Sequence, residues 1–200
     1  MAMHAAAAPA HGHASEGMSR GMAGMVLFIA SEIMLFGGMF AGYFFVRQQA
    51  ASWPPSDIEH TVSQSFGIIL SVFLISSSLT AHVGILALKR GNLPLFKLGM
   101  AVTIVLGSIF IGGQIYEWFN LFDEGLNAGS GVYGATFFLI TGFHGSHVIV
   151  GLAMLLVVLL RAIWNDFTPT RHLFADAAVT YWHFVDVIWL FVLVILYLSY

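Results

Sequence analysis

Two pairs of ionisable residues in the C-terminal half of the chain repeat one spacing. The stretch "FHGSH" holds His144 and His147, and "YWHFVD" holds His183 and Asp186. Residues three positions apart share one face of a helix, and imidazole is the commonest metal-ligating side chain. Two histidines do not complete a metal site, however, and further ligands would have to come from His82 or His183, at another level of the predicted helices. We therefore predict no metal site in this chain.

Two carboxyl groups also lie within apolar stretches. Glu32, in "ASEIMLFGG", is about eleven residues into the first stretch, and Glu117, in "GQIYEW", is near the end of the third. An ionisable side chain costs roughly 2.5–3.5 kcal/mol at the centre of a membrane helix, so it needs a partner or a function. For Glu32 we expect either a site for a proton, an ion or a lipid, or a structural hydrogen bond. Glu117 lies where water or headgroups can reach it. For His144 and His147 we favour hydrogen bonds to Glu32 or to a neighbouring helix.

The second pair has a simpler interpretation. His183 and Asp186 can satisfy each other within their own helix, or they can pair across to His82, which lies at a comparable depth. A buried ion pair is costly but tolerated when it is hydrogen-bonded. We interpret these three residues as a polar clasp between helices.

The composition places all these residues in a membrane protein. The chain has 200 residues, of which 58% are hydrophobic and 8% charged, whereas soluble domains carry about 25% charged residues. There is no cysteine, which excludes iron–sulfur clusters, zinc–thiolate sites and cysteine-bridged copper centres. The net charge of −3 and the absence of a basic run argue against a nucleic-acid partner.

Five segments are long enough to cross about 30 Å of hydrocarbon at 1.5 Å per residue. The sequence thus predicts an all-α protein, a bundle of five transmembrane helices that forms a single domain over residues 22–200. Residues 1–21 are rich in alanine and histidine, and we expect them to form a disordered tail. The predicted spans are 22–46, 65–88, 95–119, 132–163 and 177–199.

Basic residues predict the orientation of this bundle. With the N-terminus inside, Arg47 is the one basic residue outside, and the other six lie inside, at Arg20, Lys89, Arg90, Lys97, Arg161 and Arg171. Short cytoplasmic segments carry an excess of Lys and Arg. We therefore expect the N-terminus inside and the C-terminus outside.

Several long motifs carry a family resemblance. The stretches "YWHFVDVIWLF" and "GVYGATFFLITGFHGSHVIVG" resemble subunit III of the haem-copper oxidases, and "SEIMLF", "GQIYEW" and "WPP" match the same family in the same order, over about residues 30–200. The motifs are most similar to a five-helix bacterial form of cytochrome c oxidase subunit III. Within this class a quinol oxidase subunit III is the main competing interpretation, and the related subunit of a nitric oxide reductase is a weaker one. Outside this class, a self-contained proton-coupled transporter and a membrane haem or metal enzyme compete with it.

The resemblance implies a non-catalytic subunit of a proton-pumping oxidase that reduces O2 to water. Members of the family carry no haem and no copper, which belong to partner subunits, so no catalytic or cofactor-binding residue is expected here beyond sites for bound phospholipids. They pack on subunit I in a hetero-oligomer that also contains subunit II, and they support proton uptake. The resemblance places this chain in the inner (plasma) membrane of a bacterium, as a multi-pass protein.

The resemblance also assigns roles to individual residues. Glu32 matches the family's buried carboxyl, His144 and His147 match its histidines, and Arg161 and His172 fall where the family places basic residues near lipid headgroups. Basic residues at the inner interface attract anionic headgroups, although an ordinary excess of positive charge inside is the alternative.

Many members of the family have two additional N-terminal helices, which form one wall of a V-shaped lipid cleft. With five spans, this chain is expected to hold an incomplete cleft. His183 and Asp186 are then expected to act as polar hooks that fix the last helix within the bundle or against subunit I.

Overall fold

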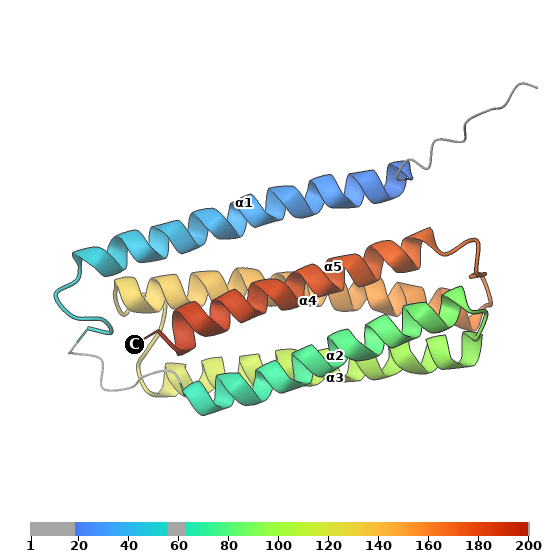
Figure 1. Ribbon diagram of the computed structural model, residues 1–200. Coiled ribbons are helices and arrows are strands. Elements are labelled where there is room, and N and C mark those ends of the chain that lie inside the picture. The colour runs from blue at the N-terminus through green and yellow to red at the C-terminus, as the bar shows by residue number, and fades with distance from the viewer. Residues whose placement is uncertain (1–18, 56–62, 200) are drawn as a thin grey trace, which may run out of the picture.

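The computed structural model describes residues 19–55 and 63–199, which contain five long helices and no β-strand (Figure 1). All five helices are long and apolar enough to cross a membrane, so the predicted all-α bundle is confirmed. The last helix continues into one turn of π-helix, η1. The elements are α1 (Arg20–Gln49), α2 (Gln64–Lys89), α3 (Leu93–Asp123), α4 (Val132–Ile163), α5 (Leu173–Val192) and η1 (Leu193–Tyr197).

The helices run antiparallel along the chain, so their ends gather at two poles of the bundle (Figure 1). We call the pole where α1 begins at Arg20 and α2 ends at Lys89 the basic end, and the opposite pole, which holds η1, the distal end. Helix α1 begins two residues earlier than predicted. The rest of the tail expected over residues 1–21 lies almost entirely outside the described residues.

Polar side chains define where three of the helices begin. Ser19, Ser63 and Asn92 each accept a hydrogen bond from a backbone N–H in the first turn of α1, α2 and α3, respectively. These bonds satisfy donors that have no partner inside the helix. Between α2 and α3 the chain reverses at Gly91, whose φ of 80° favours glycine.

Helices α2 and α3 approach each other most closely where two glycines meet. A Cβ atom on Gly99 would lie 2.9 Å from the Cα atom of Gly84 and 3.0 Å from the carbonyl oxygen of Thr80. The hydroxyls of Thr80 and Thr103 join the same two helices at 2.8 Å. Small residues of this kind let membrane helices pack backbone against backbone.

Helix α5 is the most buried of the five spans, and it packs against α1, α2 and α4. Its Trp182 indole occupies a slot between Gly107 on α3 and Gly151 on α4, where an added Cβ would lie 2.7 Å and 2.8 Å from the ring. The indole Nε1 donates to the Ser77 hydroxyl on α2 at 3.0 Å. A single side chain thereby joins four helices.

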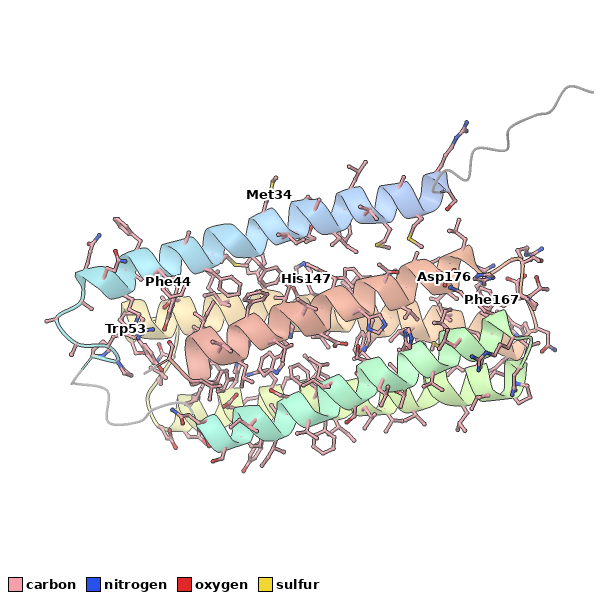
Figure 2. All side chains as sticks on the ribbon, viewed as in Figure 1. Met34, Phe44, Trp53, His147, Phe167 and Asp176 are labelled. Atoms are coloured by element: carbon pink, nitrogen blue, oxygen red, sulfur yellow. The ribbon has the colours of Figure 1, made fainter. Side chains whose placement is uncertain are left out.

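Helix α1 is the least buried span and lies along one side of the other four (Figure 1). Met34 points away from the bundle (Figure 2) and is 79% exposed. At the distal end the Tyr43 hydroxyl donates to the Ile195 carbonyl at 3.2 Å and accepts from the Trp53 indole at 2.9 Å. The Arg47 guanidinium donates to Ser199, so α1 is fastened to the end of the last helix.

The contact between Gly84 and Gly99 gives a first prediction. Gly99→Ala forces α2 and α3 apart, and overpacking of this kind typically costs about 1–3 kcal/mol. We expect a lower thermal unfolding temperature for the purified protein in detergent. The matched control is Gly112→Ala on the same helix, because a Cβ at Gly112 meets nothing within 4 Å. Equal stability of the two variants would contradict the packing described.

Candidate functional site

The structure brings Glu32 and His147 together in the middle of the membrane. Both residues lie near the midpoints of their helices, and His147 lies where α1 faces the rest of the bundle (Figure 2). Its Nε2 atom is 2.9 Å from Oε2 of Glu32. The Glu32 side chain is only 15% exposed and that of His147 13%. The Phe36 ring packs edge-on to the imidazole. The contact is one of the few that hold α1 to α4.

The hydrogen bonds of His147 show how a proton is held in this pair. Nδ1 lies 2.7 Å from the carbonyl oxygen of Phe143, and a carbonyl only accepts, so Nδ1 carries a hydrogen. Nε2 and the Glu32 carboxyl then share one further proton, either as imidazolium with carboxylate or as imidazole with carboxylic acid. In both forms the pair has no net charge, which suits its position in hydrocarbon.

His144, one turn away on α4, has a different environment. It is 1% exposed and packs against the Phe110 and Trp189 rings at centroid distances of 5.9 Å and 5.2 Å. Neither imidazole nitrogen has a hydrogen-bond partner among the described residues. An unpaired charge is very costly in such surroundings, so this imidazole is neutral. The two histidines therefore do not act as one unit.

The predicted clasp of α5 is built differently from either arrangement expected. Nδ1 of His183 meets the Ser78 hydroxyl of α2 at 2.5 Å, and the His82 and His183 rings lie 6.1 Å apart. Asp186 is 7% exposed. The Ser78 hydroxyl lies beside it, but neither carboxylate oxygen has a hydrogen bond of ordinary geometry within the described part of the chain. The link from α5 to α2 thus runs through a serine that the sequence did not indicate.

Glu117 is more enclosed than its position in the sequence indicated. It is 5% exposed, and its Oε2 accepts from the Tyr197 hydroxyl at 2.6 Å and from the Gln114 amide at 3.0 Å. Tyr197 reaches this position because its ring lies over Gly67, where a Cβ would be 2.6 Å away. A pocket of about 230 Å³, lined in part by Glu117 and Ser63, opens beside the carboxyl at the distal end.

Arg161, predicted as a headgroup ligand, has protein partners at the basic end. Its guanidinium donates to Asp166 at 2.7 Å and lies over the rings of Phe167 and Phe174 at 5.0 Å and 5.5 Å. Arg171 also pairs with Asp166. The hydrogen bond from Arg161, reinforced by Arg171, holds the pKa of the Asp166 carboxyl below its usual value.

His172, the second predicted headgroup ligand, also contacts the protein. Its Nε2 lies 3.1 Å from Oδ2 of Asp176, and Lys89 reaches the other carboxylate oxygen at 3.0 Å. Asp176 and Phe167 lie at the same end of the bundle (Figure 2). The ion pair between Lys89 and Asp176 therefore joins the end of α2 to the first turn of α5.

Two tryptophans in the middle of α5 form hydrogen bonds to α2 that were not predicted from the sequence. The Trp182 and Trp189 indoles donate to the hydroxyls of Ser77 and Ser71 on α2 at 3.0 Å and 2.8 Å. Tryptophan in membrane proteins is enriched at the interfaces, so its presence at mid-span was a usable signal of a buried hydrogen bond. Within the described residues, no three His, Cys, Asp or Glu side chains come close enough together to hold a metal ion.

Comparison with known proteins gives consistent matches over all five helices. A family model described as "Cytochrome c oxidase subunit III" matches residues 3–199. Three relatives carry the name "Cytochrome c oxidase subunit 3". The relative from Corynebacterium diphtheriae is 39% identical over 177 residues, which cover 87% of this chain and 85% of the relative. That from Thermostichus vulcanus is 35% identical, with 93% and 90% covered, and that from Papio hamadryas is 37% identical, with 87% and 67% covered.

The contact between Glu32 and His147 predicts measurable energetic coupling. In a double-mutant cycle with Glu32→Gln and His147→Ala, we expect a coupling energy of about 0.6–2 kcal/mol, the range found for polar contacts between membrane helices. The measurement is the unfolding free energy of the purified protein in detergent. The control cycle pairs Glu32→Gln with Thr141→Val, because within the described residues the Thr141 hydroxyl bonds to the Phe137 carbonyl of its own helix. A coupling equal to that of the control would show that the contact adds no stability.

Asp166 predicts how the basic end responds to acid. A carboxyl whose pKa is lowered on folding stabilises the protein above the ordinary pKa, and this contribution is lost as the pH falls through the lowered value. We expect Asp166→Asn to reduce the unfolding temperature at neutral pH. The difference from the wild-type protein should shrink as the pH is taken below about 4. A difference that does not change with pH would contradict the proposed ion pairs.

Proposed function

The chain belongs to the cytochrome c oxidase subunit III family, and on this premise we propose that it is the non-catalytic subunit III of a proton-pumping terminal oxidase. Haem and copper in partner subunits reduce O2 to water with electrons from cytochrome c. This chain packs against subunit I in a hetero-oligomer with subunit II. We further propose that the complex lies in a bacterial plasma membrane with the basic end inside, as the basic residues of that end favour.

The observation that carries the proposal is the pairing of Glu32 with His147. The two side chains lie 2.9 Å apart at mid-membrane and share one proton in a mostly enclosed contact between α1 and α4. Ionisable groups at this depth belong to proton or ion pathways more often than to the structural framework. A hydrogen-bonded carboxyl and imidazole at this depth support the proposed role of this subunit in proton uptake by the oxidase.

An apolar groove supports the proposed binding of phospholipid. It runs between α1 and α4 in the distal half of the bundle, with a volume of about 600 Å³, and its lining includes Leu35, Gly38, Met39 and Leu139. A groove with this lining suits lipid acyl chains, which need no polar partner. At the basic end both Arg161 and Arg171 pair with Asp166, but the Arg171 side chain is 74% exposed and that of Arg161 37%, so Arg171 is the better candidate for a headgroup contact.

The test is to purify this chain with an affinity tag from its own membranes in mild detergent. Identification of the co-purified subunits and a reduced-minus-oxidised spectrum then distinguish the candidate functions. We expect haem A bands and a copper-containing subunit II, which define a cytochrome c oxidase. Haem together with a copper-free subunit II would assign the chain to a quinol oxidase. No partner, combined with proton-coupled transport by the chain alone in liposomes, would overturn the proposal.

A further inference from the structure

Helix α2 exposes a histidine within the hydrocarbon layer. His82 lies on the surface of the bundle, seven residues before the end of α2 at Lys89, which places it about 10 Å from that end. Helix α2 has 26 residues, so it is about 39 Å long and extends about 4–5 Å beyond a 30 Å hydrocarbon core on each side. His82 therefore lies inside the apolar layer.

The imidazole of His82 is poorly placed to escape to the membrane surface. In a helix the Cα–Cβ bond tilts towards the N-terminus, and the N-terminus of α2 is at the distal end, so His82 leans away from the nearby Lys89 end. The imidazole of His82 lies 6.1 Å from the His183 ring, measured between centroids. No described residue forms a side-chain hydrogen bond with His82. Lipid chains offer none either.

Behind His82, further polar groups continue into the bundle. The Ser78 hydroxyl meets Nδ1 of His183, and beneath them Asp186 is buried. We call these four residues, Ser78, His82, His183 and Asp186, the α2–α5 polar patch. It lies where α2 and α5 run side by side, on a face that α1 leaves open because α1 packs on α4 and α5 (Figure 1).

Apolar side chains surround the point where this patch opens to the membrane. Leu79, Val83 and Leu86 lie on the same face of α2 as His82 and are 65%, 43% and 38% exposed. A surface that faces lipid is apolar throughout, because acyl chains cannot form hydrogen bonds with an imidazole. Here a polar centre lies within an apolar rim. It matches a helix–helix contact in a membrane, where one polar side chain hydrogen-bonds across the interface.

We propose that the α2–α5 polar patch is the docking surface for a transmembrane helix of another oxidase subunit. That helix presents a hydroxyl, amide or carboxyl side chain at the depth of His82 and hydrogen-bonds to its imidazole. This inference rests on the proposed function, since it requires an oxidase around the chain, and it adds the face through which the chain is held. A docked helix would also explain why His183 and Asp186 of α5 adjoin the exposed His82 and are not surrounded by apolar side chains alone.

Site-specific photocrosslinking in the assembled oxidase tests this surface. A photoreactive phenylalanine analogue replaces Val83 beside the patch or, as a control, Val150, which is 51% exposed on α4. We expect Val83 to crosslink to a second oxidase subunit, identified by mass spectrometry, and Val150 to give lipid adducts. Lipid adducts alone at Val83, or a crosslinked dimer of this chain, would overturn the proposal.

Two substitutions of His82 test the hydrogen bond itself. His82→Leu removes it, whereas His82→Gln keeps a donor and an acceptor. With an affinity tag on subunit I, we expect the Leu variant to be retained several-fold less than wild type in a stringent detergent, and the Gln variant close to wild type. Equal retention of the Leu variant would overturn the role of His82. If the wild-type chain did not co-purify with any oxidase subunit, the proposed function itself would fail, and the docking surface with it.

Discussion

The fold depends on the contact that Trp182 makes at the centre of the bundle. Lipid tails are as apolar as the helices, so burial of apolar surface does not drive helices together as it does in water. Close packing and internal hydrogen bonds must replace it. Trp182 supplies both, because its ring fits between Gly107 and Gly151 and its N–H reaches Ser77. One large side chain of α5 thus contacts two glycines, on α3 and α4, and one serine, on α2.

The polar residues in the membrane follow the same constraint in different ways. Glu32 meets His147 across an interface between helices, and Glu117 is bound by Tyr197 and a glutamine. In both sites the carboxyl group has at least one hydrogen-bond partner within the chain. The imidazole of His82 has none among the described side chains, and it reaches the surface of the bundle inside the hydrocarbon layer. This difference separates groups that serve the chain itself from one that is suited to a partner.

Helix α1 has a distinct place in this scheme. The other four helices are joined by Trp182, whereas α1 is attached at mid-membrane through Glu32 and at the distal end through Tyr43 and Arg47. Between these attachments an apolar groove separates it from α4. The pair that carries the proposed proton function is therefore also a fastening of the least buried helix.

The sequence alone determined that the chain is a membrane bundle of five helices, because apolar stretches of that length have no other stable form in lipid. It also located the residues that need partners, since an ionisable side chain in hydrocarbon is costly wherever the fold places it. It did not identify the partners. The spacing of His144 and His147 defines one helix face, but only the rotation and tilt of α1 and α4 decided that His147 meets Glu32 while His144 packs among rings. Likewise, His183 bonds to Ser78 and not to Asp186 because α2 presents a hydroxyl at that level, and neighbours across helices are set by packing, which local spacing does not encode.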